Sequence, residues 1–301
     1  MWIIWIGLRM ARVLIVLLLL LTCSGLRHHS LACPPACSCP GSSMLNCSLA
    51  GLRALPQNLD SVADLDISHN HLERATLLRR TLPRLRSLRL ANNSITRLSL
   101  CIHGRVEGRG CASWAPNLQL LSVERNQLRR LPRGLSAIEA LEILQLSFNN
   151  ITTIQLGELD NLRGLRELHL QHNLISSLHP NAFRHLHQLE ILDVSFNMLT
   201  SLDPSIYFSL HTIGTDVHLA GNKWHCNCIM RNIRRWMAIN RNRGSHSWDL
   251  VCASPPILAG ADVLHLEDDD LNCWSTEKEP QDVTVQQGSD VLLSCTTRGN
   301  S

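Results

Sequence analysis

Aromatic residues, net charge and catalytic motifs are all scarce in this sequence. Aromatic side chains make up 4% of the 301 residues, and the formal net charge is only +3. The small net charge gives no general preference for nucleic acid, and the sparse aromatics disfavour an enzyme built around an aromatic pocket. The sequence also has no Gly-x-Ser-x-Gly motif, phosphate-binding loop, His-Glu-x-x-His motif or Cys/His pair with a free thiol. We therefore expect a protein that is not an enzyme and that has neither a cofactor nor a catalytic metal.

What the chain does contain is a repeated pattern of leucines that ends in one asparagine. Residues 165–175 read L-x-x-L-x-L-x-x-N-x-I, and the same frame recurs on both sides. Counted between successive asparagines, the spacing is 23, 33, 23, 24, 24 and 25 residues. The seven asparagines are Asn70, Asn93, Asn126, Asn149, Asn173, Asn197 and Asn222. This period indicates a leucine-rich repeat solenoid, of α/β type, over residues 58–222.

The spacing within one repeat predicts which side chains face the core. Residues two apart in a strand share a face, so Leu168 and Leu170 should point inward while Glu167 and His169 point outward. One short strand cannot bury its apolar face alone, and stacked repeats therefore form a parallel sheet on the concave side, with a mostly irregular convex side. Each asparagine can bond backbone groups of the neighbouring turn, which gives it a structural role and not a catalytic one.

The N-terminal residues 1–25 have the pattern of a secretory signal peptide. Arg9 and Arg12 precede an apolar run over residues 13–21, and small residues follow. A membrane-anchoring helix is the alternative, but nine apolar residues fall short of the roughly 20 that span a bilayer. We expect a protein that is secreted or held at the cell surface.

The twelve cysteines gather mainly at the two ends of the repeats, which is typical of disulfides in a secreted protein. One repeat interval is ten residues too long, and Cys101 and Cys111 bracket the loop that contains the excess. We interpret this stretch as a disulfide-closed excursion that stabilises the chain by about 3 kcal/mol, and its three glycines argue against a packed element. It is either a tolerated surface insertion or a contact loop led by Arg105 and Arg109.

The outward strand positions predict a protein-binding surface on the concave face. Their mixed polarity suits a protein partner, and an apolar column beside them suggests a contact patch, although scattered exposed aliphatics would look the same. His169, Asp193 and His218 would lie on successive strands about 4.8 Å apart, where they could bind a metal or form ordinary polar surface. The predicted protein-binding residues are Arg89, Leu120, Ile143, Gln145, His169, Ile191 and Asp193.

Two further surface features are visible in the sequence. Three sequons make Asn46, Asn92 and Asn150 candidate glycosylation sites, with Asn46 less accessible because it adjoins Cys47. After the repeats, five arginines lie within thirteen residues and could bind a sulfated glycan or anionic lipid headgroups. A solvated face balanced by the acidic residues 267–270 is the alternative. These arginines are Arg231, Arg234, Arg235, Arg241 and Arg243.

The cysteine motifs at both ends resemble the caps of extracellular leucine-rich repeat proteins. Residues 33–57 match the C-x3-C-x-C spacing of the N-terminal cap, and residues 223–273 match the C-terminal cap apart from Lys223 and Asn227. Ile229, Ile233, Trp236 and Met237 form an apolar stripe at helical spacing, which predicts a helix. The resemblance implies that Trp224 and Trp236 are core residues of the cap. It also implies four disulfides, which join Cys33 with Cys39, Cys37 with Cys47, Cys226 with Cys252, and Cys228 with Cys273.

Residues 279–301 resemble the opening strands of an immunoglobulin domain. The sequence stops before the core Trp and second Cys of such a sandwich, so we expect a truncated domain in which Cys295 lacks its partner. Cap, repeats, cap and immunoglobulin start together resemble the leucine-rich repeat and immunoglobulin transmembrane family, most nearly its Kekkon-like group. The resemblance implies a cell-surface adhesion protein, receptor or receptor modulator that binds another extracellular protein and has a membrane anchor only in a longer form. A soluble matrix or decoy protein is the alternative.

Overall fold

The structure is a computed structural model that describes residues 33–75, 81–107, 110–213, 215–240 and 248–273. The expected signal peptide and immunoglobulin-like segment lie outside these residues, as do Cys295, Arg109, Arg241 and Arg243. The same holds for the side chain of Arg105.

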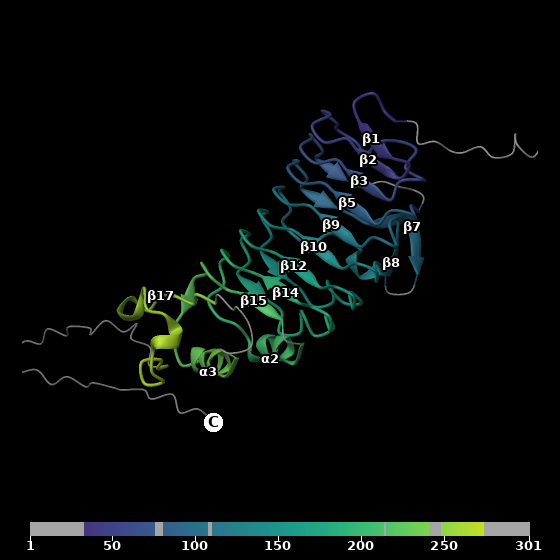
Figure 1. Cartoon of the computed structure of the whole chain (residues 1–301). Coiled ribbons are helices and arrows are strands. Elements are labelled where there is room, and N and C mark those ends of the chain that lie inside the picture. The colour runs from purple at the N-terminus through teal and green to yellow at the C-terminus, as the bar shows by residue number, and fades with distance from the viewer. Residues whose placement is uncertain (1–32, 76–80, 108–109, 214, 241–247, 274–301) are drawn as a thin grey trace, which may run out of the picture.

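Two strands from the N-terminal cap and one from each of the seven repeats build a nine-stranded sheet that runs the length of the solenoid (Figure 1). The first two strands pair antiparallel, and all later neighbours pair parallel and in chain order. This is the parallel sheet that the repeat period predicts. Its strands are β1 (Ser38–Gly41), β2 (Met44–Asn46), β3 (Asp64–Asp66), β5 (Ser87–Arg89), β9 (Leu120–Ser122), β10 (Ile143–Gln145), β12 (Glu167–His169), β14 (Ile191–Asp193) and β15 (Asp216–His218).

The side of the solenoid that follows each asparagine contains only short elements. Two pairs of two-residue strands lie there, β4 (Arg74–Ala75) with β6 (Arg97–Leu98) and β11 (Thr153–Ile154) with β13 (Ser177–Leu178). A 3-10 turn, η1 (Leu135–Ala137), and one helix, α2 (Pro204–Ile213), complete this side. The backbone N–H of Ser205 donates to the Asp203 carboxylate, and Pro204 takes the first helical position, so local sequence starts α2 where the repeats become irregular.

The inward leucines form one continuous core, as predicted. Leu168 and Leu170 are completely buried, and the same holds for their equivalents from Leu65 to Leu219 within 2%. The asparagine ladder also has its predicted role. Asn173, for example, accepts from the backbone N–H of Ile151 at 3.0 Å and donates to the carbonyl oxygens of Leu146 and Leu170. Each asparagine thereby ties its own turn to the preceding one.

The insertion between Cys101 and Cys111 contains a regular element, so the expectation that its glycines exclude one is wrong. Strands β7 (Cys101–Glu107) and β8 (Gly110–Ser113) pair antiparallel as a hairpin beside the main sheet (Figure 1). The backbone hydrogen bonds of such a ladder do not require side chains, and the Cys101–Cys111 disulfide also joins its two strands. The hairpin is fastened to the body at its base, where the buried Trp114 donates its indole N–H to the carbonyl oxygen of Ser99 at 3.0 Å.

Disulfide-linked caps close both ends of the core. Strands β16 (Trp224–His225) and β17 (Cys252–Ser254) pair in the C-terminal cap, which also contains helix α3 (Met230–Asn240) and the 3-10 turns η2 (Pro256–Leu258) and η3 (Val263–His265). The five disulfides of the described chain are Cys33–Cys39, Cys37–Cys47, Cys101–Cys111, Cys226–Cys252 and Cys228–Cys273.

Helix α3 buries a stripe that differs from the expected one by a residue. Ile229 is 49% exposed, whereas Met230 is buried and completes the stripe with Ile233 and Met237. Asn227 explains the offset, because its side chain accepts from the backbone N–H of Ile229 and so caps the helix before Met230. Trp224 and Trp236 are buried, as expected of cap core residues.

Candidate protein-binding face

Two columns of outward side chains make up the concave face. They come from the first and third residue of each strand, and parallel pairing sets them in register from one repeat to the next. The first column is Met44, Asp64, Ser87, Leu120, Ile143, Glu167, Ile191 and Asp216. The second column is Asn46, Asp66, Arg89, Ser122, Gln145, His169, Asp193 and His218.

All seven predicted protein-binding residues lie in these columns, but the apolar ones do not form an unbroken row. Leu120 and Ile143 are direct neighbours, whereas Glu167 separates Ile143 from Ile191. Each of the three aliphatic side chains is half-buried, because neighbouring strands leave only part of its surface accessible. The face therefore has a small apolar centre with a carboxylate inside it.

The concave face is acidic, which inspection of the middle column alone did not reveal. The two columns together contain five carboxylates and one guanidinium, that of Arg89. The carboxylates belong to Asp64, Asp66, Glu167, Asp193 and Asp216. Like charges gathered on one curved surface attract a partner of opposite charge and repel other acidic surfaces.

His169 and His218 each lie close to a carboxylate on their own strand, and Asp193 bonds the serine two residues later. His169 Nε2 lies 3.1 Å from Glu167 Oε2, and His218 Nε2 lies 3.5 Å from Asp216 Oδ2. Asp193 Oδ1 accepts from the hydroxyl of Ser195 at 2.6 Å. The described part of the chain contains no group of three His, Cys, Asp or Glu residues that could hold a metal ion. The contacts of His169 with Glu167 and of Asp193 with Ser195 fit the polar-surface interpretation of these residues.

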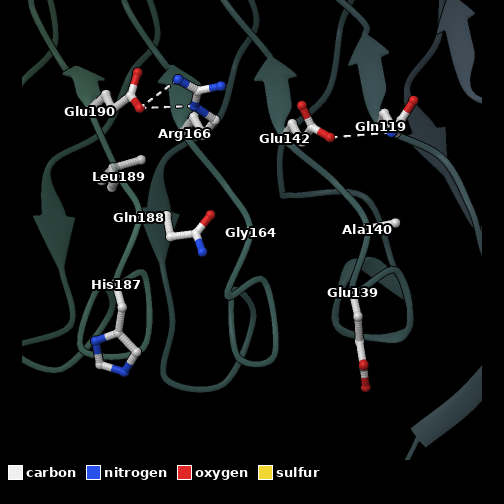
Figure 2. Close-up of a pocket in the computed structure, with 10 residues that line it drawn as sticks. All are labelled: Gln119, Glu139, Ala140, Glu142, Gly164, Arg166, His187, Gln188, Leu189 and Glu190. Carbon is white, nitrogen blue, oxygen red and sulfur yellow. Dashed lines mark hydrogen bonds and ion pairs between the residues drawn. The ribbon is translucent and has the colours of Figure 1, made fainter.

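A polar hollow of about 690 Å³ borders the concave face at the start of strands β10, β12 and β14. Figure 2 shows a row of side chains along its edge, in which Arg166 pairs with Glu190 and Gln119 donates to Glu142. Arg166 Nη2 lies 2.7 Å from Glu190 Oε1, and this hydrogen bond raises the pKa of the guanidinium. The row extends the polar surface of the sheet without forming a nucleophile and base pair.

A stacked column of side chains at the rim was not predicted. The residue before each ladder asparagine has positive φ. In three consecutive repeats this residue has a ring, and the rings stack. The ring centres of Phe148 and His172 are 4.3 Å apart, and those of His172 and Phe196 are 4.5 Å apart. Arg125 covers the outer face of Phe148 at 4.2 Å. Left-handed backbone is uncommon for Phe. The signal in the sequence was that a residue with a ring precedes the ladder asparagine in three consecutive repeats.

The three sequons lie in different environments. Asn46 is exposed in the second column of the concave face, so the expectation that the nearby disulfide hides it is wrong. Asn92 is half-buried, and its Nδ2 lies 3.5 Å from His69 Nε2. Asn150 is exposed at the rim, one residue after the ladder asparagine Asn149. A glycan on Asn46 would cover the N-terminal end of the concave face, so we place the expected protein contact on the middle repeats.

Acidic side chains balance much of the basic cap patch. Arg234 Nη1 lies 3.0 Å from Asp268 Oδ1, Arg235 Nη2 lies 2.6 Å from Asp268 Oδ2, and Glu267 is 3.6 Å from Arg234. The hydrogen bond from Arg235 is the main cause that lowers the pKa of Asp268. Arg231 completes the predicted glycan-binding set and is half-buried beside them. The balanced-face interpretation fits these contacts better than an open basic patch.

Comparison with known proteins agrees with this architecture. The leucine rich repeat family matches residues 116–175 and 163–212. The fold is a capped leucine-rich repeat solenoid. A solved structure of human trophoblast glycoprotein, also named Wnt-activated inhibitory factor 1, aligns with a TM-score of 0.58 at 21% identity, over 82% of this chain and 100% of that chain.

Several curated relatives share the repeats. Human leucine-rich repeats and immunoglobulin-like domains protein 3 is 37% identical over 127 residues, which are 41% of this chain and 10% of the relative. Bovine keratocan is 30% identical over 147 residues, 46% of this chain and 37% of the relative. Human platelet glycoprotein Ib beta chain is 34% identical over 65 residues, 19% and 31% of the two chains. The solenoid thus matches about a tenth of the length of the first of these relatives. In the described residues, no helix has the length and apolar character that a membrane crossing requires.

Proposed function

We propose that the chain is an extracellular protein-binding module and that its concave sheet contacts the partner. The observation that carries this proposal is the register of the two outward columns, which present one broad and rigid surface over eight strands. Such a surface can add contacts over several repeats without an enclosed pocket. The five disulfides support an oxidising, extracellular setting.

The composition of the face defines the partner surface that would fit. Leu120 and Ile143 form an apolar centre, and Ile191 extends it beyond Glu167. Carboxylates surround this centre on several repeats, so a complementary surface has apolar side chains within a ring of Lys and Arg. We infer a protein partner with a basic contact surface, such as the ectodomain of another cell-surface protein.

The relatives support a role at the cell surface. Two of them combine leucine-rich repeats with immunoglobulin-like domains by name, and the sequence ends in a segment that resembles such a domain. We propose a receptor, adhesion or receptor-modulating protein, Kekkon-like in organisation, with residues 1–25 as signal peptide, residues 33–57 and 223–273 as caps, residues 58–222 as repeats and residues 279–301 as the start of the immunoglobulin domain. A soluble matrix or decoy protein would use the same face, and an apolar stretch of about 20 residues in the full-length transcript would distinguish the two.

The test is a double substitution at the apolar centre. Ile143→Glu with Ile191→Glu places two carboxylates on the outward column and leaves the inward leucines unchanged. The probe is an array of purified cell-surface ectodomains screened with the multimerised wild-type protein. We expect the double variant to be secreted normally and to lose at least about 30-fold in affinity for the ectodomain that the screen identifies, because central interface residues carry most of the binding energy.

A matched control tests whether a loss of binding depends on where the two new carboxylates lie or only on their charge. Leu156→Glu with Ile257→Glu also replaces two aliphatic residues, which are 50% and 90% exposed and lie outside the two columns. This control should bind like the wild type. Equal binding by wild type and the Ile143/Ile191 variant would show that the concave assignment is wrong.

A further inference from the structure

A basic groove lies on the side of the solenoid that follows the asparagine ladder. Its volume is about 940 Å³, and it runs across the turns of neighbouring repeats. It therefore lies on a different side of the repeats from the concave columns, which belong to the strands. The residues that line this basic groove are Thr96, Arg97, Leu98, Ser99, Gln127, Arg129, Arg130, Leu131, Arg133 and Asn150.

The charge of the groove is all of one sign. Four of these ten residues are arginines, and none is acidic. The groove therefore holds four positive charges, whereas the whole chain has a net charge of +3. All four arginines are exposed, and none forms an ion pair within the described residues. Their guanidinium groups are consequently available to an anion.

The backbone beneath these side chains is fixed. The N–H of Arg133 donates to the carbonyl oxygen of Leu98 at 2.9 Å, and the carbonyl oxygen of Arg133 accepts from the N–H of Leu100 at 2.8 Å. Leu98 and Leu131 are buried and anchor the groove to the core. Arg97 and Arg133 are 36 positions apart in sequence. The backbone bonds between Arg133 and residues 98–100 bring them to one groove. A rigid base reduces the ordering that a bound ligand has to impose.

The comparison with the cap patch favours the groove as the anion site. Arg234 and Arg235 at the cap share Asp268, so a ligand there would have to compete with a carboxylate that is already in place. In the groove no carboxylate has to be displaced. A guanidinium group without an ion-pair partner can donate two parallel charge-assisted hydrogen bonds to a new anion. A paired guanidinium group gains less from that anion, because it already donates to a carboxylate.

We propose that the basic groove binds a sulfated glycosaminoglycan. Sulfate groups would accept from Arg97, Arg129 and Arg130, while Gln127 supplies a neutral amide for sugar hydroxyls. The ten lining residues include no aromatic ring on which a nucleobase could stack. The groove and the concave face are separate, so a glycan chain and a protein partner can be held at the same time.

The experiment measures binding to heparin as the sulfated probe. The groove variant is Arg97→Gln, Arg129→Gln and Arg130→Gln. Its matched control is Arg53→Gln, Arg84→Gln and Arg163→Gln, which removes three exposed arginines outside the groove and without ion pairs in the described residues. We expect the groove variant to elute from a heparin column at lower salt and to lose at least about ten-fold in affinity for a heparin oligosaccharide, whereas the control retains most of it.

Four further measurements make each outcome decisive. Equal losses in the groove and control variants would show a general charge effect and overturn the proposal, and a loss only with Arg231→Gln, Arg234→Gln and Arg235→Gln would assign the site to the cap. Retained heparin binding with lost binding to phosphatidylserine vesicles would replace the glycan with a membrane surface. Because Asn150 lines the groove, the comparison is made before and after enzymatic deglycosylation, and we expect the loss in both states. Equal melting temperatures confirm that each variant is folded.

Discussion

Asn149 offers a direct test of how the repeats are held together. Its side chain is buried between the turns of two repeats, where Oδ1 accepts from the backbone N–H of Leu128 at 3.0 Å. Nδ2 donates to the carbonyl oxygens of Val123 at 2.9 Å and Leu146 at 3.0 Å. Asn149→Ala removes all of these bonds and leaves the sequon at Asn150 intact.

The bonds are not equally costly to lose. The carbonyl oxygen of Val123 keeps Asn126 as a second donor, and that of Leu146 keeps Asn173. The bond lost at each carbonyl therefore lowers the free energy of unfolding by at most about 1 kcal/mol. The N–H of Leu128 is buried, and Asn149 is its hydrogen-bond acceptor, so removing Asn149 costs about 1–3 kcal/mol for that group. We expect Asn149→Ala to lower the free energy of unfolding by about 2–4 kcal/mol.

Urea unfolding measures this loss, provided that the slope with denaturant stays unchanged. The control is Asn181→Ala, because Asn181 is exposed and uses only its backbone in hydrogen bonds. It should change stability by less than about 0.5 kcal/mol. Asn149→Asp keeps the acceptor for Leu128 but turns an oxygen toward the carbonyl oxygens of Val123, Leu146 and Ser147. At neutral pH it should therefore be at least as unstable as Asn149→Ala. A stable Asn149→Asp protein, or an alanine variant equal to the control, would refute this account of the ladder.

Two other predictions concern the hairpin and the C-terminal cap. A Cβ on Gly134 would lie 2.8 Å and 3.0 Å from the two sulfurs of the hairpin disulfide, so Gly134→Ala should lower the urea midpoint more than Gly51→Ala, which shares a positive φ but meets no atom within 4 Å. At the cap, Arg235 lowers the pKa of Asp268, so the ion pair stabilises the fold above the ordinary aspartate pKa of about 3.9 and its contribution disappears as pH falls through the lower folded value. Asp268→Asn should therefore be less stable than wild type at neutral pH, and the difference should shrink as the pH falls below the ordinary aspartate pKa. A difference that stays constant into acid would contradict this reasoning.

The repeats, the inward leucines and the asparagine ladder followed from the sequence alone. These features depend on periods of two residues within a strand and about 24 residues between strands, and both periods are written in the chain. The pattern of immediate neighbours in the sequence determines which face of the sheet a side chain such as Leu168 occupies. The outward position of Ile143 and His169 could be predicted for the same reason, because it is the complement of the inward pattern.

The contacts between repeats were decided only by the tertiary structure. Whether Glu167 interrupts the apolar row, or Phe148 stacks on His172, depends on the register of strands that are 24 residues apart. The basic groove depends further on turns of unequal length, which bring Arg97 beside Arg133 across the hairpin insertion. A local pattern determines which face a residue occupies, but its neighbours on that face come from other repeats. The acidic concave side and the basic groove are therefore properties of the stacked solenoid and not of any single repeat.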